Sequence, residues 1–210
     1  MTFYSPKESL IDLTERLDKK SRFAYLNIPK SSIVALSKNS DNAFPSHFAK
    51  NVINSFKSKD EGILKAIPNI LKDDINANRH YKIGLNKNSN YHYSNVFEYY
   101  YHEDREVYDS ILSYYIKNTK TVAVSFNDKK FITKCFGYNC HVINVPYTTQ
   151  YDKIDDVYAQ ISELDGDIDY VLLDCGVFGL GLLPKVWSNL SVSVIDFGKT
   201  LLSVKNDMKG

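Results

Sequence analysis

The chain has 210 residues, and its 26 lysines and arginines against 25 aspartates and glutamates leave a formal net charge of +1. A chain so close to neutral has no overall field that would attract it to nucleic acid or a membrane surface, and no apolar run approaches the ~18 residues of a membrane-spanning helix. Hydrophobic residues make up 43% of the sequence, which is enough for one sizeable core, so we expect a single α/β domain over residues 1–210.

The first half of this domain, residues 1–118, has an irregular pattern. Ser5, Pro6 and Glu8 form a capping box with proline at the first helical position, which predicts a helix from Pro6 onward. The remaining elements expected here are a strand over 21–29, helices over 46–56 and 61–71, a strand over 80–87 and a helical region over 96–116. Pro68 should interrupt the helix over 61–71.

The second half, residues 119–210, alternates short β-branched runs with amphipathic stretches. The expected strands cover 120–126, 140–146, 169–176 and 192–198, and the expected helices cover 128–138, 151–164 and 180–190. Asn127 is the predicted cap of the first of these helices. Right-handed crossovers turn this βαβαβαβ order into a Rossmann-like parallel sheet with helices on both faces.

The carboxyl ends of parallel strands share one edge of a sheet, beside helix N-termini whose free N–H groups suit phosphate. The loops after the four strands therefore form one candidate nucleotide site, with Asn127, Thr148, Thr149, Gly176, Gly179 and Lys199 as its polar or glycine residues. Taken singly, each of these residues is also explained by ordinary turns and helix caps. Asp196 ends the last strand about twenty residues after Gly176, the spacing at which a dinucleotide fold places its ribose-binding carboxylate, although it could equally cap the final turn.

Other patterns in the sequence carry less information. The glycines at 176, 179 and 181 read G-x-x-G-x-G rather than the G-x-G-x-x-G of a dinucleotide fingerprint. Asp165-Gly166-Asp167 precedes a strand, so we assign it to a turn at the amino edge rather than to a metal. The histidines and the three cysteines have no metal-ligand spacing, and an odd number of cysteines suits a reducing compartment, so we expect no metal site and a cytoplasmic location.

Six segments, taken in order, resemble the GT-D type glycosyltransferases, bacterial enzymes that move a sugar from a UDP-sugar onto a glycan of a serine-rich adhesin. They are "SRFAYLN", "YKIGLNK", "TVAVSFNDKKF", "INVPYTTQYDKI", "LLDCGVFGLGLLPKVW" and "VIDFGK". The resemblance implies a GT-D-like fold and a UDP-sugar as donor substrate. The donor-binding residues expected from it are Lys87, Phe126, Asn127, Tyr147, Thr148, Thr149, Gly176, Val177, Phe178, Gly179, Asp196 and Lys199.

One departure from that family concerns its metal. The positions that match the family's acidic D-x-E are Tyr25 and Asn27, and neither replaces a carboxylate as a ligand for a hard cation, so a divalent metal is doubtful. Cationic side chains can neutralise a departing diphosphate instead, and the candidates are Arg22, Lys30, Lys87 and Lys199. With His80 as the first candidate for the general base, ahead of His47 and His92, the expected catalytic set is Arg22, Tyr25, Asn27, Lys30 and His80.

The sequence leaves the acceptor open. The frequent Lys, Asn, Ile and Tyr residues suggest an AT-rich genome such as many phages have, so one candidate acceptor is a hydroxymethylated base in phage DNA, and another is a glycan. The competing hypotheses are an NAD- or S-adenosylmethionine-binding Rossmann enzyme and a catalytically degenerate nucleotide-binding domain. No membrane partner is expected, and the oligomeric state is not predicted.

Overall fold

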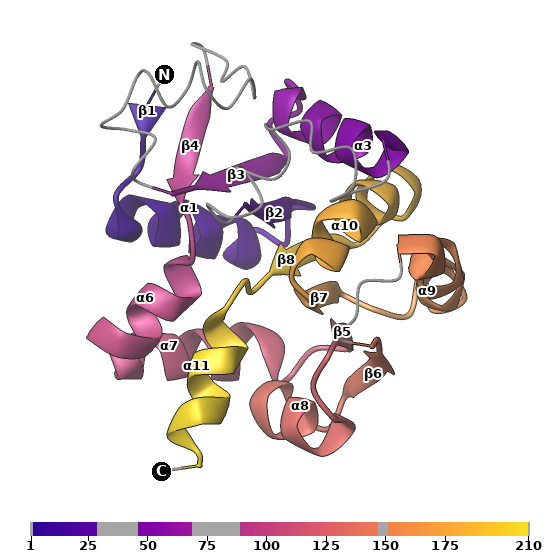
Figure 1. Ribbon diagram of the computed structural model, residues 1–210. Helices are drawn as coiled ribbons and strands as arrows, with labels where there is room; N and C mark the ends of the chain where they lie inside the picture. Colours follow the sequence, from indigo (N-terminus) through magenta and orange to yellow (C-terminus); the bar gives the residue numbers. More distant parts are fainter. Residues whose placement is uncertain (1, 29–45, 69–88, 147–150, 210) are drawn as a thin grey trace.

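The computed structural model describes residues 2–28, 46–68, 89–146 and 151–209 (Figure 1). Its strands are β1 (Thr2–Phe3), β2 (Ala24–Asn27), β3 (Ile63–Ile67), β4 (Asn90–Tyr93), β5 (Thr121–Ser125), β6 (Cys140–Asn144), β7 (Tyr170–Asp174) and β8 (Ser193–Asp196). They form one sheet in the order β1-β4-β3-β2-β8-β7-β5-β6, and neighbouring strands pair in parallel. The predicted α/β fold with a Rossmann-like parallel sheet is confirmed.

Helices cover both faces of this sheet. Helices α3 (Ser46–Lys57), α9 (Ile154–Ser162) and α10 (Val177–Asn189) pack on one face, with a short 3-10 turn η2 (Tyr151–Lys153) before α9. The other face carries α1 (Pro6–Asp18), α6 (Val96–Glu103), α7 (Arg105–Ile111), a π-helical turn η1 (Leu112–Ile116), α8 (Lys129–Phe136) and α11 (Thr200–Asp207). Every residue of the central strands β2, β5, β7 and β8 is buried, as expected for a parallel sheet that is covered on both sides.

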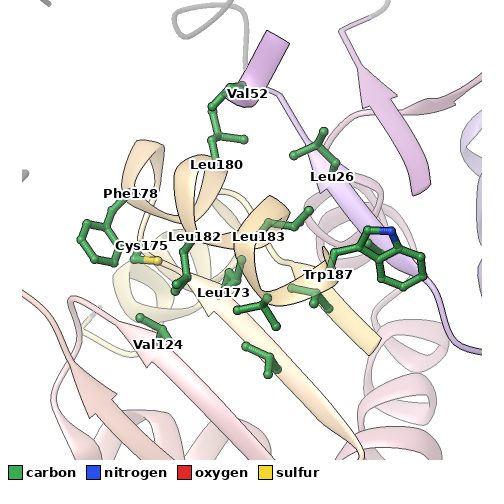
Figure 2. Packing of buried hydrophobic residues seen from close by; sticks show 14 of the residues in the cluster. Leu26, Val52, Val124, Leu173, Cys175, Phe178, Leu180, Leu182, Leu183 and Trp187 are labelled. Atoms are coloured by element: carbon green, nitrogen blue, oxygen red, sulfur yellow. The ribbon is translucent and has the colours of Figure 1, made fainter. Parts of the chain in front are cut away.

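Helix α10 is the centre of the first face. Its residues from Phe178 to Leu183 are all buried, and its leucines point toward Leu173 of β7 and toward α3 (Figure 2). Gly181 allows α3 to approach closely, since a Cβ atom there would lie 2.1 Å from the ring of Phe48. The apolar run after Gly176 therefore forms a core helix that begins at the carboxyl edge of the sheet.

The order of the strands reverses between β5 and β7. The chain leaves β5 through α8 on one face to reach β6, and it returns from β6 through α9 on the other face to reach β7 on the opposite side of β5. Such a switch point leaves a crevice outside the carboxyl ends of the two strands, where open α/β sheets bind their ligands.

Two sequence expectations are wrong. Residues 63–67 are a strand, not part of a helix over 61–71. The spacing of the apolar residues in this segment fits a helix or a strand, and pairing with β2 on one side and β4 on the other decides for the strand. The cap of α8 is Asp128, whose side chain accepts a hydrogen bond from the Phe131 amide at 2.9 Å, and not Asn127. The capping box of Ser5 and Glu8 and the turn at Gly166 are confirmed.

Strands β1 and β4 and helix α11 were not predicted, and the predicted strand over 80–87 lies outside the described residues. None of the described helices combines the length and the apolar character needed to cross a bilayer.

Candidate functional site

The carboxyl ends of β5 and β7 are joined by a hydrogen-bonded group of side chains at the switch point. The Asp174 carboxylate accepts hydrogen bonds from Ser125 Oγ at 2.6 Å and Asn127 Nδ2 at 2.8 Å. Asn127 Oδ1 in turn accepts from Lys205 Nζ at 2.6 Å, and the Asn127 carbonyl accepts from Asn144 Nδ2 at 2.7 Å. We call these five residues the Asp174 network, and they bring β5, β6, β7 and α11 to one place.

Helix α10 begins beside this network. Its cap, Gly176, has φ +53°, a backbone conformation that favours glycine, and a Cβ atom there would lie 3.7 Å from the ring of Phe126. The Phe178 and Gly179 amides of its first turn donate to the Cys175 and Gly176 carbonyls at 3.2 and 3.0 Å. The N-terminus of α10 therefore acts at the switch point mainly through the positive end of its dipole. A Cβ atom at Gly179, in the first turn, would lie 3.3 Å from Cys175 Sγ and 3.4 Å from the Leu173 side chain, so there is little room for a larger residue.

A second polar cluster lies where β2 and β8 end. Asn27 Nδ2 donates to Asn95 Oδ1 at 2.7 Å, and the Asn95 amide donates back to Asn27 Oδ1 at 3.2 Å. Gly198 packs against this pair with φ +60°, and a Cβ atom there would lie 2.0 Å from Asn27 Nδ2. The Gly198 amide donates to Asp196 Oδ1 at 2.9 Å. These four residues, which we call the Asn27 cluster, tie the first half of the sheet to the second.

The two buried aspartates at this edge have raised pKa values. Burial raises the pKa of Asp196 to about 8, against the opposing hydrogen bond from Gly198, and the charge of Asp174 adds to the rise. Burial also raises the pKa of Asp174 to about 6, while the hydrogen bonds from Ser125 and Asn127 and the charge of Lys205 lower it. At neutral pH Asp196 is therefore mostly protonated and Asp174 mostly ionised, so the edge carries less negative charge than two aspartates suggest.

The structure brings many of the predicted site residues to this edge. Those with their backbone at the carboxyl ends of strands or in the turns that follow are Asn27, Phe126, Asn127, Gly176, Val177, Phe178, Gly179, Asp196 and Lys199. Phe178 points into the core with 2% of its surface exposed, so it supports α10 rather than a ligand. The predictions for Lys30, His80, Lys87, Tyr147, Thr148 and Thr149 lie outside the described residues.

Two predicted catalytic residues have other contacts. Arg22 precedes β2 and so lies at the amino edge, where its guanidinium donates to the carbonyls of Trp187 and Leu190 and stacks 3.8 Å from the centre of the Trp187 ring. It closes the C-terminal end of α10, and this position does not bring it to a diphosphate at the carboxyl edge. Tyr25 is fully buried, and its hydroxyl donates to the Tyr93 carbonyl at 2.7 Å.

The contacts of Tyr25 and Asn27 decide whether these two positions could hold a metal ion. Tyr25 is buried in the core with its hydroxyl on the Tyr93 carbonyl, and both polar atoms of the Asn27 side chain are engaged by Asn95. The described residues contain no group of three or more histidines, cysteines and acids placed to hold an ion. The residues at the two matched positions do not fit a metal, and we derive no step through one.

Among the candidate bases, His92 is buried beneath α1, with Nε2 3.3 Å from the Asp12 carboxylate. Burial lowers its pKa to about 4, against the charge of Asp12. The side chain of His47 is not among those described. His92 is therefore a packed, neutral residue whose side chain lies against Asp12 of α1.

Sequence reasoning missed Ser125, Asn144, Asp174 and Lys205. Asp174 carries the signal that singled out Asp196, an acid at the end of a buried strand, and it could have been found in the same way. Lys205 has no such signal, because only the return of α11 across the β5 end brings it to Asn127.

Solved structures with the same fold are known. A selenomethionine-substituted structure of domain of unknown function 1792 (DUF1792) matches with a TM-score of 0.72 at 14% identity, over 100% of this chain and 83% of that chain. A second, described by the statement that this highly conserved domain has a distinct glycosyltransferase fold, has a TM-score of 0.71 at 14% identity with the same coverage. A third, described as a new glycosyltransferase (DUF1792) from Streptococcus sanguinis, has a TM-score of 0.68 at 14% identity, over 100% of this chain and 85% of that chain.

No protein-family model and no curated protein matches the sequence. At this level of identity the likeness to the three structures establishes the fold alone.

Proposed function

We propose that this protein is a glycosyltransferase of the GT-D type, which binds a UDP-sugar at the carboxyl edge and transfers the sugar to a hydroxyl acceptor. The observation that carries the proposal is the position of the Asp174 network and the α10 N-terminus together at the switch point between β5 and β7. The likeness of the fold to proteins described as glycosyltransferases supports the same reaction class.

The diphosphate of the donor is proposed to lie between the positive end of the α10 dipole and the Lys205 ammonium. Lys205 uses one of its three N–H groups on Asn127 and is half-buried, so the others remain for phosphate oxygens. Phe126 beside Gly176 offers a ring for the uracil base. The protonated Asp196 removes one of the two negative charges that would repel an incoming diphosphate.

Sugar transfer leaves a UDP whose negative charge grows in the transition state. A helix N-terminus and a fixed ammonium at that position stabilise the charge without rearrangement, and the loss of one such donor typically costs about 3 kcal/mol of activation free energy. We propose this role for Lys205 and the α10 N-terminus, with Lys199 at the start of α11 as a more exposed second cation. Lys30 and Lys87 stay as predicted contributors.

For the acceptor we propose a hydroxyl group, with a hydroxymethylated base of phage DNA as the first candidate and a glycan as the second. His80 stays the predicted general base. The proposed setting is the cytoplasm, that of the host if the gene belongs to a phage.

The test is a thermal-shift series with UDP-sugars, UDP, NAD and S-adenosylmethionine, followed by assay of UDP release in the presence of hydroxymethylated DNA or simple glycans. Stabilisation by UDP and a UDP-sugar, with release of UDP and a matching mass increase of one acceptor, is the expected result. Stabilisation by NAD or S-adenosylmethionine alone would replace the proposal with another enzyme class. Binding of UDP-sugar with no turnover on any acceptor would leave a nucleotide-binding domain without catalysis.

A further inference from the structure

A broad depression on the second face of the sheet gathers four lysines. Its volume is about 1150 Å³, and it is lined by Lys117, Lys129, Lys130, Thr133, Lys134, Gly137, Tyr138 and Asn139. We call it the lysine surface. Its lining contains four cations and no acid, a charge of +4, in a chain whose cations and acids otherwise nearly balance. The concentration of one sign of charge creates a local positive potential that the net charge of +1 conceals.

The four lysines lack acidic partners, unlike five other cations of the described residues. Arg16, Lys19, Arg105, Lys153 and Lys185 each form an ion pair with an aspartate or glutamate. Among the described residues no ion pair involves a lysine of the lysine surface. Lysines held near one another without acids repel, and a polyanion that replaces their counterions relieves this repulsion.

An exposed aromatic ring stands among these lysines. Tyr138 is 96% exposed, the largest exposure among the described large hydrophobic side chains. It follows Gly137, which has φ +94° and packs so tightly that a Cβ atom would lie 2.9 Å from the Lys117 carbonyl. The glycine fixes the turn between α8 and β6, and the turn directs Tyr138 outward.

Tyr114 provides a useful contrast. It is 73% exposed, but it makes an edge-to-face contact with Tyr115, with 4.8 Å between ring centres. No such ring contact involves Tyr138 in the described part of the chain. Its ring is accessible for stacking, and rings that stand free beside lysines are the pattern by which proteins hold unpaired bases next to a phosphate backbone.

We propose that the lysine surface binds single-stranded nucleic acid, with phosphates along α8 and a base stacked on Tyr138. An acidic peptide would satisfy the lysines but gives no reason for an exposed ring, whereas every base has a face that can stack. The surface begins at Lys129, two residues after Asn127 of the Asp174 network, so a strand that follows α8 over its length of ~12 Å leads toward the carboxyl edge. The binding itself does not depend on the proposed sugar transfer.

The first experiment measures fluorescence anisotropy of a labelled single-stranded DNA 12-mer from 25 to 200 mM NaCl. Each phosphate neutralised contributes about 0.7 to the slope of log affinity against log salt. The double variant Lys130→Gln/Lys134→Gln should therefore reduce the slope by about 1.4 and weaken binding at least ten-fold at low salt, by roughly the salt-linked contribution of two phosphate contacts. Lys19→Gln/Lys153→Gln removes the same charge elsewhere and should bind as the wild type does.

The second experiment tests stacking. Tyr138→Ala should weaken binding roughly ten-fold with the salt slope unchanged, Tyr138→Phe should restore it, and Tyr114→Ala should have no effect. Melting temperatures confirm that these exposed substitutions leave the fold intact. The proposal is overturned if the wild type does not bind the 12-mer at 25 mM NaCl or if both lysine double variants bind equally well. It is also overturned if a duplex or polyglutamate of equal charge competes as effectively as the single strand.

Discussion

The charged residues at the two edges of the sheet differ in their partners and in the effect of burial on their pKa values. At the amino edge, Arg22 donates to two carbonyls and stacks on Trp187, and Asp60 accepts from Trp187 Nε1 at 2.8 Å. At the carboxyl edge, Asp174 and Asp196 are both buried, and the loss of solvation raises the pKa of each carboxyl group. The charge of Asp174 raises the pKa of Asp196 further.

The difference identifies the edge at which the fold keeps unfavourable arrangements of charged groups. Arg22 and Asp60 at the amino edge have partners inside the protein, and both hold α10 in place. The carboxyl edge instead holds two buried aspartates whose pKa values are raised by loss of solvation, one of them mostly protonated at neutral pH. Unfavourable arrangements of this kind are retained at ligand sites more often than at structural ones.

The largest effect is expected from a matched pair of glycines, one at each edge. Gly198→Ala at the carboxyl edge should lower the free energy of unfolding by about 4 kcal/mol, because it combines a left-handed backbone with overlap against Asn27. Gly166→Ala at the amino edge has φ +88° but no atom within 4 Å of its new Cβ, so it should cost about 1 kcal/mol. Urea denaturation measures both, and equal costs would mean that the Asn27 cluster is not tightly packed.

The second prediction concerns pH. An unfolded aspartate has a pKa near 3.9, and in the folded protein the pKa of Asp196 is raised to about 8. Between these values the folded state holds a proton that the unfolded state has lost, so stability falls as pH rises. The wild type should lose about 3 kcal/mol of unfolding free energy between pH 6 and pH 8, and Asp196→Asn should lose only about 0.4 kcal/mol, which comes from Asp174.

The control for the pH series is Asp165→Asn in the exposed turn of the amino edge, which should leave the slope of the wild type unchanged. A wild type whose stability rises between pH 6 and pH 8 would contradict the description of the carboxyl edge. The same slope in the wild type and Asp196→Asn would assign the effect to another group.

The third prediction separates the edges by function. Arg22→Ala should destabilise the protein by about 2 kcal/mol, since two hydrogen bonds and a cation–π contact are lost. Trp187 is the single tryptophan of the chain, so its fluorescence reports directly on this contact. The affinity of the folded variant for UDP-sugar should not change. A large loss of affinity at unchanged stability would mean that Arg22 belongs to the donor site.

The sequence predicted the second half of the fold well, and the reason is local. Runs such as Thr121–Ser125 and Tyr170–Asp174 are apolar over a strand length and are bounded by turn residues, so period and length agree. The segment 63–67 was misassigned because its apolar spacing fits a helix or a strand, and only pairing with β2 and β4 decides between them.

The candidate site was predictable only in part. Strand ends in a parallel sheet meet at one edge, so Asn127, Gly176 and Asp196 could be placed together from their order alone. Which cation joins them could not be predicted, because Arg22 and Lys205 are equally charged in sequence. The fold sends the first to the amino edge and the second to Asn127.

The smallest expected effect comes from comparing the two cations of the carboxyl edge, Lys205 and Lys199. Lys205→Met removes the ammonium beside Asn127 and keeps most of the apolar side chain, so it should weaken UDP binding about ten-fold, or about 1.4 kcal/mol. Lys199→Met removes the same charge from an exposed position and should weaken it about two-fold, because solvent and salt screen that lysine. Isothermal titration calorimetry with UDP at two salt concentrations compares the variants, and the effect of Lys199→Met should shrink at the higher one. A larger loss for Lys199→Met than for Lys205→Met would move the diphosphate from the β5–β7 switch point toward the start of α11.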